Sequence, residues 1–167
     1  MSKSLNIAKG GLYTALTIIF LYISSIVPTS RLFFMALAAA MIPISIISTN
    51  IKNSVVVYAA ASLLSLLLAL RGIAFMYIVF FGLYGFVKYY VERLRTVVLE
   101  FVLKFLFFNG CLYLIYLIYK VFTFGLPTVN TPIYYIIAGL QVVFIIYDYA
   151  MTILIFSINK RLKLRRL

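Results

Sequence analysis

The apolar stretch that decides the fold lies in the last third of the sequence. Residues 133–157 read IYYIIAGLQVVFIIYDYAMTILIFS, and Asp148 is the only charged residue among these 25. About 20 apolar residues, rising 1.5 Å each along a helix, cross the hydrocarbon core of a bilayer. We therefore expect this stretch to form a transmembrane helix.

Five more apolar runs precede this stretch, at residues 10–27, 32–48, 54–70, 72–90 and 99–122. Hydrophobic residues make up 66% of the chain and charged residues 11%, whereas a typical soluble domain has roughly a quarter of its residues charged. The sequence predicts an all-α polytopic membrane protein, in which residues 1–167 form one bundle of six transmembrane helices. Gly125, Pro127 and Pro132 predict a loop before the last span, and residues 159–167 form a basic tail.

The basic residues predict how the six spans are oriented. With six spans, one side of the membrane receives twelve of them: Lys3, Lys9, Lys52, Lys88, Arg93, Arg95, Lys104, Lys160, Arg161, Lys163, Arg165 and Arg166. The other side receives only Arg31, Arg71 and Lys120. Because lysine and arginine are enriched on the cytoplasmic side, we expect both termini in the cytoplasm and the chain in the cytoplasmic membrane. Attraction to anionic lipid headgroups accounts for the net charge of +12 without a nucleic-acid partner.

Several kinds of chemistry are excluded by composition. The chain has no histidine and only one cysteine, Cys111, so histidine-based metal sites, Ser/His/Asp triads and Cys/His pairs cannot form. Cys111 lies within an apolar run, where we interpret it as a small packing residue. We expect no metal, no cofactor and no enzymatic activity.

Asp148 is the most informative single position. A carboxylate inside a span is costly unless it is paired or hydrated, and such residues often mark a functional site. One interpretation is a structural ion pair with Lys104 on the neighbouring span, and the other is a role in ligand binding or coupling. Glu100 and Lys104 are four residues apart, so they could also pair on one helix face.

Other polar residues could line a cavity within or above the spans. Gln141 and Tyr116 lie in the last two spans, although such side chains also commonly hydrogen-bond or pack between helices. Arg31 and Asn130 fall in the predicted outer loops, where they would serve either anion recognition or simple connection. The sequence leaves these alternatives open.

The first span carries a ridge of small residues, Ala8, Gly11 and Ala15. Its members are three and four residues apart and therefore lie on one face of a helix. Small residues allow helices to approach closely in lipid, so the ridge predicts a helix contact.

A short chain of six predicted spans with both ends inside and this ridge on its first helix resembles the substrate-binding S components of energy-coupling-factor importers. In that family an A-x-x-x-A motif contacts a transmembrane coupling subunit. Here the matching residues read Gly11-Leu12-Tyr13-Thr14-Ala15, with glycine replacing the first alanine. The resemblance implies capture of a vitamin or other micronutrient from outside, with Arg31, Tyr116, Asn130 and Gln141 as pocket residues. It also implies that partner ATPases supply the energy, and the chain contains no G-x-x-x-x-G-K-[ST] motif.

The main alternative is a membrane scaffold of the cell-shape or sporulation type, which binds other membrane subunits and transports nothing. A capture subunit should enclose a cavity in its outer half. A scaffold can be packed solid, with its small-residue ridges exposed.

Overall fold

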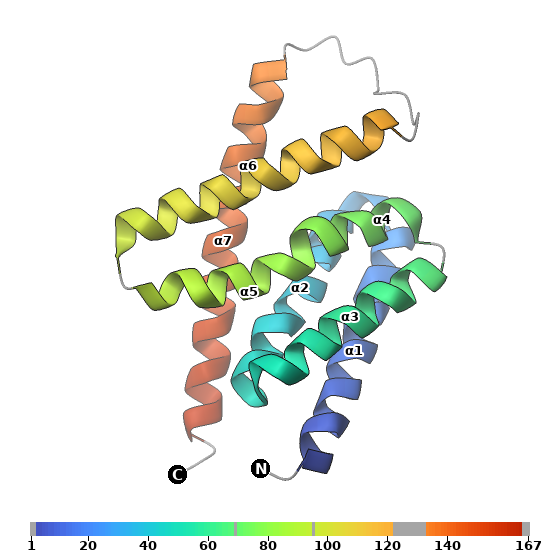
Figure 1. The fold of residues 1–167 in the computed structure, drawn as a ribbon, viewed down its shortest axis with the longest axis vertical. Helices are drawn as coiled ribbons and strands as arrows, with labels where there is room; N and C mark the ends of the chain where they lie inside the picture. The colour runs from blue at the N-terminus through green and yellow to red at the C-terminus, as the bar shows by residue number, and fades with distance from the viewer. Residues whose placement is uncertain (1–2, 69, 95, 122–132, 165–167) are drawn as a thin grey trace.

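The computed structural model describes residues 3–68, 70–94, 96–121 and 133–164, and these are helical apart from short connections (Figure 1). The helices are α1 (Lys3–Ile26), α2 (Arg31–Ser48), α3 (Ile51–Leu67), α4 (Arg71–Met76), α5 (Gly82–Val91), α6 (Val97–Val121) and α7 (Ile133–Leu164). A π-helical segment, Tyr77–Phe81, joins α4 to α5 without a break. Short 3₁₀ turns at Pro28–Ser30 and Glu92–Leu94 precede α2 and follow α5.

Five helical segments are long and apolar enough to cross a membrane: Ser4–Ile26, Pro28–Ser48, Gly72–Leu94, Val97–Leu117 and Ile137–Ile158. They coincide with five of the six predicted spans. The third predicted span, residues 54–70, corresponds to α3, which has 17 residues and is shorter than the others. The chain is therefore a helical, multi-pass membrane protein. The predicted loop at residues 123–132 lies outside the described residues.

The helices do not all run side by side as in a regular bundle. Helices α1, α2 and α3 pack closely against one another, and α7 packs against α2. In the view of Figure 1, α7 crosses α5 and α6. The beginning of α1 and the end of α7 lie at the same end of the molecule in this view. Helix α7 continues to Leu164, so the first part of the predicted basic tail is helical. Lysine and arginine are good helix formers and favour the negative end of the helix dipole, which allows this extension.

The packing is that of a protein surrounded by lipid. Large apolar side chains such as Leu67, Val98 and Phe156 are more than two-thirds exposed, whereas small and hydroxyl-bearing residues such as Ala39, Ala61 and Ser54 are buried between helices. Lipid tails are as apolar as leucine, so helix association in a bilayer depends on close approach and on hydrogen bonds rather than on burying large side chains.

Two glycines let α5 approach its neighbours. A Cβ atom on Gly85 would lie 2.9 Å from Cδ of Pro43 and 3.0 Å from Cβ of Ile42, both on α2. A Cβ atom on Gly82 would lie 2.6 Å from the ring of Tyr58 on α3. The shortest distance at each glycine, 2.9 Å at Gly85 and 2.6 Å at Gly82, is shorter than real Cβ contacts. Helix α5 can therefore hold this position against α2 and α3 only with glycine at these two positions.

The π segment is stabilised by side chains from two other helices. Its wider turns move backbone carbonyls out of the regular helical register, where other donors can reach them. The Tyr58 hydroxyl on α3 donates a hydrogen bond of 2.9 Å to the carbonyl of Ile78, and the Cys111 thiol on α6 donates one of 3.2 Å to the carbonyl of Val79. Cys111 is thus more than a packing residue, because its thiol also joins α6 to the π segment.

Replacing Tyr58 with phenylalanine removes the donor to Ile78 and keeps the ring that packs against Gly82. We expect the variant to lose about 0.5–1.5 kcal/mol of stability, the usual net worth of a hydrogen bond. Unfolding of the purified protein in mixed detergent measures the difference. The control is Tyr113→Phe on the exposed face of α6, which should unfold like the wild type. Equal stability of all three proteins would show that the π segment does not depend on this bond.

Candidate functional site

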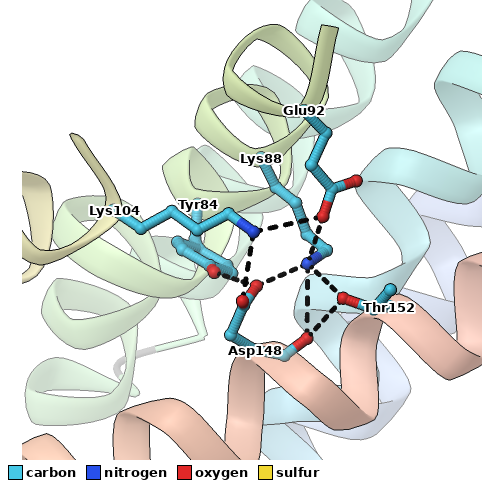
Figure 2. Close-up of polar contacts among 6 residues, drawn as sticks. All are labelled: Tyr84, Lys88, Glu92, Lys104, Asp148 and Thr152. Carbon is cyan, nitrogen blue, oxygen red and sulfur yellow. Dashed lines mark hydrogen bonds and ion pairs between the residues drawn. The ribbon is translucent and has the colours of Figure 1, made fainter. Parts of the chain in front are cut away.

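Six polar residues from three helices meet in the part of the molecule where α7 crosses α5 and α6 (Figure 2). We call this group the ion cluster; its members are Tyr84, Lys88, Glu92, Lys104, Asp148 and Thr152. Spacings of four residues place Tyr84, Lys88 and Glu92 on one face of the α5 segment, and Asp148 and Thr152 on one face of α7. Lys104 reaches the same point from α6.

Lys88 is at the centre of the ion cluster, and its side chain is completely buried. Its ammonium nitrogen lies 2.7 Å from Oε1 of Glu92 and forms a salt bridge with Oδ1 of Asp148. It also donates a hydrogen bond of 2.7 Å to Oγ1 of Thr152. An ammonium group has three hydrogens, and these three partners can use all of them.

The carboxylate of Asp148 accepts hydrogen bonds from the other two helices of the ion cluster, α5 and α6. The Tyr84 hydroxyl donates to its Oδ1 at 2.5 Å, and Nζ of Lys104 lies 3.1 Å from its Oδ2. Lys104 also lies 3.2 Å from Oε1 of Glu92, so each lysine contacts both carboxylates. Two positive and two negative groups make the cluster formally neutral.

A closed, neutral network suits a structural joint better than an open binding site. Charged groups in a low-dielectric interior are costly when alone and tolerable when each is paired and hydrogen-bonded. Removing any one of the four charges would leave one charge of the opposite sign uncompensated, so the network holds α7 at a defined position against α5 and α6. The carboxylates keep some access to solvent, with the side chains of Glu92 and Asp148 32% and 18% exposed.

The structure brings Asp148 and Lys104 together, which is the contact considered from sequence. It also adds four members that sequence reasoning missed: Tyr84, Lys88, Glu92 and Thr152. The salt bridges of Lys104 run to Glu92 and Asp148 rather than to Glu100 on its own helix. The sequence assigns Lys88 to the basic residues on the cytoplasmic side of the membrane, yet its side chain is buried in the ion cluster.

A separate apolar cavity of about 330 Å³ lies between α2, the π segment, α6 and α7. Its sixteen lining residues are aliphatic, aromatic, alanine, methionine or cysteine, and none carries a charge. Phe80, Phe144 and Tyr147 belong to this lining and also contact the ring of Tyr84 in tilted or edge-on arrangements. The cavity and the ion cluster are thus joined through one layer of aromatic side chains.

Three of the four predicted pocket residues are described by the structure, and none of these three lines the cavity. Arg31, Tyr116 and Gln141 are each next in sequence to a lining residue, namely Leu32, Ile115 and Leu140. Gln141 instead donates a hydrogen bond of 2.9 Å to Asn109 on α6. Asn130 lies outside the described residues, and the binding roles of all four stay predictions.

The ridge of small residues predicted on the first span lies on α1, and we call it the α1 ridge. It is on an open face of the molecule. Ala8, Gly11 and Ala15 are all exposed, and a Cβ atom added to Gly11 would meet nothing within 4 Å. Gly10, by contrast, faces inward, where a Cβ atom would lie 2.9 Å from Nδ2 of Asn53 on α3. The ridge therefore makes no close contact with the described parts of this chain at Gly11.

These features define a multi-pass helical membrane protein with a buried ion cluster and a charge-free cavity. No group of three or more histidine, cysteine or acidic side chains that could hold a metal ion occurs in the described ranges. No protein-family model, no curated protein and no solved structure matches the chain.

Proposed function

We propose that the chain is the substrate-capture subunit of an importer of the energy-coupling-factor type, with a binding role and no catalytic step. The observation that carries this proposal is a cavity of ligand size within a helical membrane protein whose α1 ridge is exposed on a different surface. At about 330 Å³ the cavity falls within the range of known small-molecule sites. A capture subunit needs both features, one for the ligand and one for its partner.

In this proposal the chain crosses the cytoplasmic membrane six times, with α3 as the shortest span and both termini inside. The shared location of the start of α1 and the end of α7 supports this orientation (Figure 1). Lys88 and Lys104 are neutralised in the ion cluster, so they report less on orientation than free lysines do. Ten of the twelve basic residues assigned to the cytoplasmic side still remain, against three on the other.

In the same orientation the cavity lies mostly toward the outer side of the membrane and the ion cluster toward the inner side, and the two meet on α7, where the lining residues Tyr147 and Ala150 flank Asp148. The lining residues Phe33, Met76 and Leu112 occupy the outward halves of their spans, whereas Lys88, Lys104 and Asp148 occupy the inward halves. The cavity thus lies on the side from which an imported compound arrives. The ion cluster lies on the side where the ATPase subunits would act.

The α1 ridge is the proposed contact with the membrane-embedded coupling subunit. Small residues on an open helix face let another helix approach closely and gain van der Waals contact. The ridge begins near the inner end of α1, close to the side on which ATP is hydrolysed.

A scaffold that binds other membrane subunits is the second candidate, and the charge-free cavity lining is what favours it. A vitamin carries polar groups that would need convergent hydrogen-bonding partners, and the cavity lining offers few. The exposed α1 ridge fits a scaffold equally well.

Purification of the tagged protein from its native membrane tests the two candidates. A capture subunit should bring with it ATPases that carry the G-x-x-x-x-G-K-[ST] motif, together with a coupling subunit. Shape-determining or division proteins in their place would refute the importer and support the scaffold.

Replacing Gly11 with leucine tests the α1 ridge directly. We expect the variant to lose its partner subunits in the same purification while its own stability changes by less than about 0.5 kcal/mol, as for exposed substitutions. Gly110→Leu is the matched control, because Gly110 also has open space around its Cβ position but lies on α6. Retention of the partners by Gly11→Leu would remove the ridge from the interface.

A further inference from the structure

The apolar cavity has a wall open to the lipid and a floor closed off from it. Leu32 and Phe33 of α2 and Val143 and Ile146 of α7 line it, yet each is about half exposed or more on the outer surface of the protein. Phe108, Cys111 and Phe144 line it as well, and each is at most 6% exposed. The first group forms the mouth of the cavity, and the second forms its floor.

The position of the mouth determines what can enter. Its residues lie on the apolar faces of α2 and α7, which are in contact with lipid tails when these helices span a bilayer. A water-soluble compound would have to leave water and cross hydrocarbon to reach such an opening. A hydrocarbon chain that is already in the bilayer reaches it without any change of solvent.

The chemistry of the lining selects the same class of compound. A charged group placed in the cavity would meet no charged lining residue, and the lysines and carboxylates of the ion cluster are already paired with one another. The Cys111 thiol is also engaged, since it donates to the carbonyl of Val79. A polar compound would lose its hydration and gain few bonds in return, whereas a hydrocarbon chain loses nothing.

We propose that the cavity binds a long hydrocarbon chain, which enters sideways from the bilayer between α2 and α7. This inference names the ligand class of the capture site and rests on the proposed function. The polar end of such a ligand, whether a lipid headgroup or a free carboxyl group, stays outside the mouth.

Photo-crosslinking tests this inference on the full-length protein in liposomes. Two probes carry a diazirine in the alkyl chain: a phosphatidylcholine, which belongs to the bilayer, and free palmitic acid. We expect adducts on the floor residues Cys111 and Phe144, which other lipid tails cannot reach, in addition to adducts on lipid-facing positions. Floor adducts from the phospholipid identify a membrane lipid as the source of the chain, and floor adducts from palmitic acid alone identify a free amphiphile.

Two variants that fill the cavity from opposite sides make the test specific. Ala150→Phe on α7 and Ala36→Phe on α2 both place a ring in the cavity and should abolish the floor adducts. Ala138→Phe is the control, because Ala138 is exposed on α7 and does not line the cavity. Adducts confined to the outer faces, or floor adducts that persist in both filled variants, would overturn the inference.

The outcome separates this inference from the proposed function. If ATPases co-purify and the floor is never labelled, the hydrocarbon ligand is refuted while the capture subunit stands. If the floor is labelled and no ATPase co-purifies, the importer is refuted and the protein is a lipid-binding membrane protein.

Discussion

Replacing Lys88 with methionine is expected to destabilise the folded protein by about 3–5 kcal/mol, the usual cost of breaking a buried ion pair from one side. Methionine keeps most of the length of the side chain and removes its charge and its hydrogen-bond donors. Glu92 and Asp148 would then share the single positive charge of Lys104, and Thr152 would lose its donor. Unfolding in mixed detergent, followed by circular dichroism, measures the loss.

A second variant shows whether this loss reflects charge imbalance. Lys88→Met combined with Asp148→Leu removes one charge of each sign and leaves the Lys104–Glu92 pair, so it should be more stable than Lys88→Met alone. Lys52→Met, at an exposed position on α3, should change nothing. A double variant that is less stable than the single one would show that the cluster is not held together by charge balance.

The same double variant separates a structural role of Asp148 from a functional one. If it folds and still binds its partner subunits and the hydrocarbon probe, the ion cluster acts only as a joint between helices. If it folds and loses either property, Asp148 or Lys88 takes part in coupling.

Replacing Gly85 with leucine is expected to cost at least about 1–3 kcal/mol, the range for overpacking a well-packed core. Its Cβ atom alone would lie 2.9 Å from Pro43, whose ring cannot rotate away, and 3.0 Å from Ile42. Helix α5 must then separate from α2, and the ion cluster moves with it, because its member Tyr84 is next to Gly85 on the same helix. We expect lower stability in the detergent unfolding assay and lower yield in the membrane.

Gly110→Leu provides the matched control for Gly85→Leu, since nothing lies within 4 Å of its Cβ position. Equal stability of the two variants would show that α5 and α2 are farther apart in the membrane than in this structure.

The helices themselves were largely predictable from sequence. In lipid, every backbone polar group must be hydrogen-bonded within the protein, and a helix achieves this within a single long apolar run. The predicted runs at residues 32–48 and 72–90 match α2 and the segment from Arg71 to Val91 closely. The π segment was not predictable, because it depends on donors from Tyr58 and Cys111, 19 or more residues away from it in sequence.

The ion cluster was only partly predictable, for a related reason. Sequence gives the depth of a charged residue along its helix, which was enough to consider Asp148 with Lys104. The packing of the helices determines which face of each helix meets which neighbour. This packing, which the sequence does not show, also brings Lys88 and Glu92 into the cluster. The spacing of four between Tyr84, Lys88 and Glu92 was the available signal, since it aligns three polar groups on one face of an otherwise apolar segment.

The ion cluster also bears on how the protein is made. Ribosomes synthesise α5 and α6 before α7, so Lys88, Lys104 and Glu92 emerge first and carry one surplus positive charge. The compensating carboxylate, Asp148, follows Lys104 by 44 residues. Until that last helix enters the bilayer, the nascent chain has to keep one lysine hydrated at the membrane surface, and arrival of α7 is the step that allows both lysines to be buried.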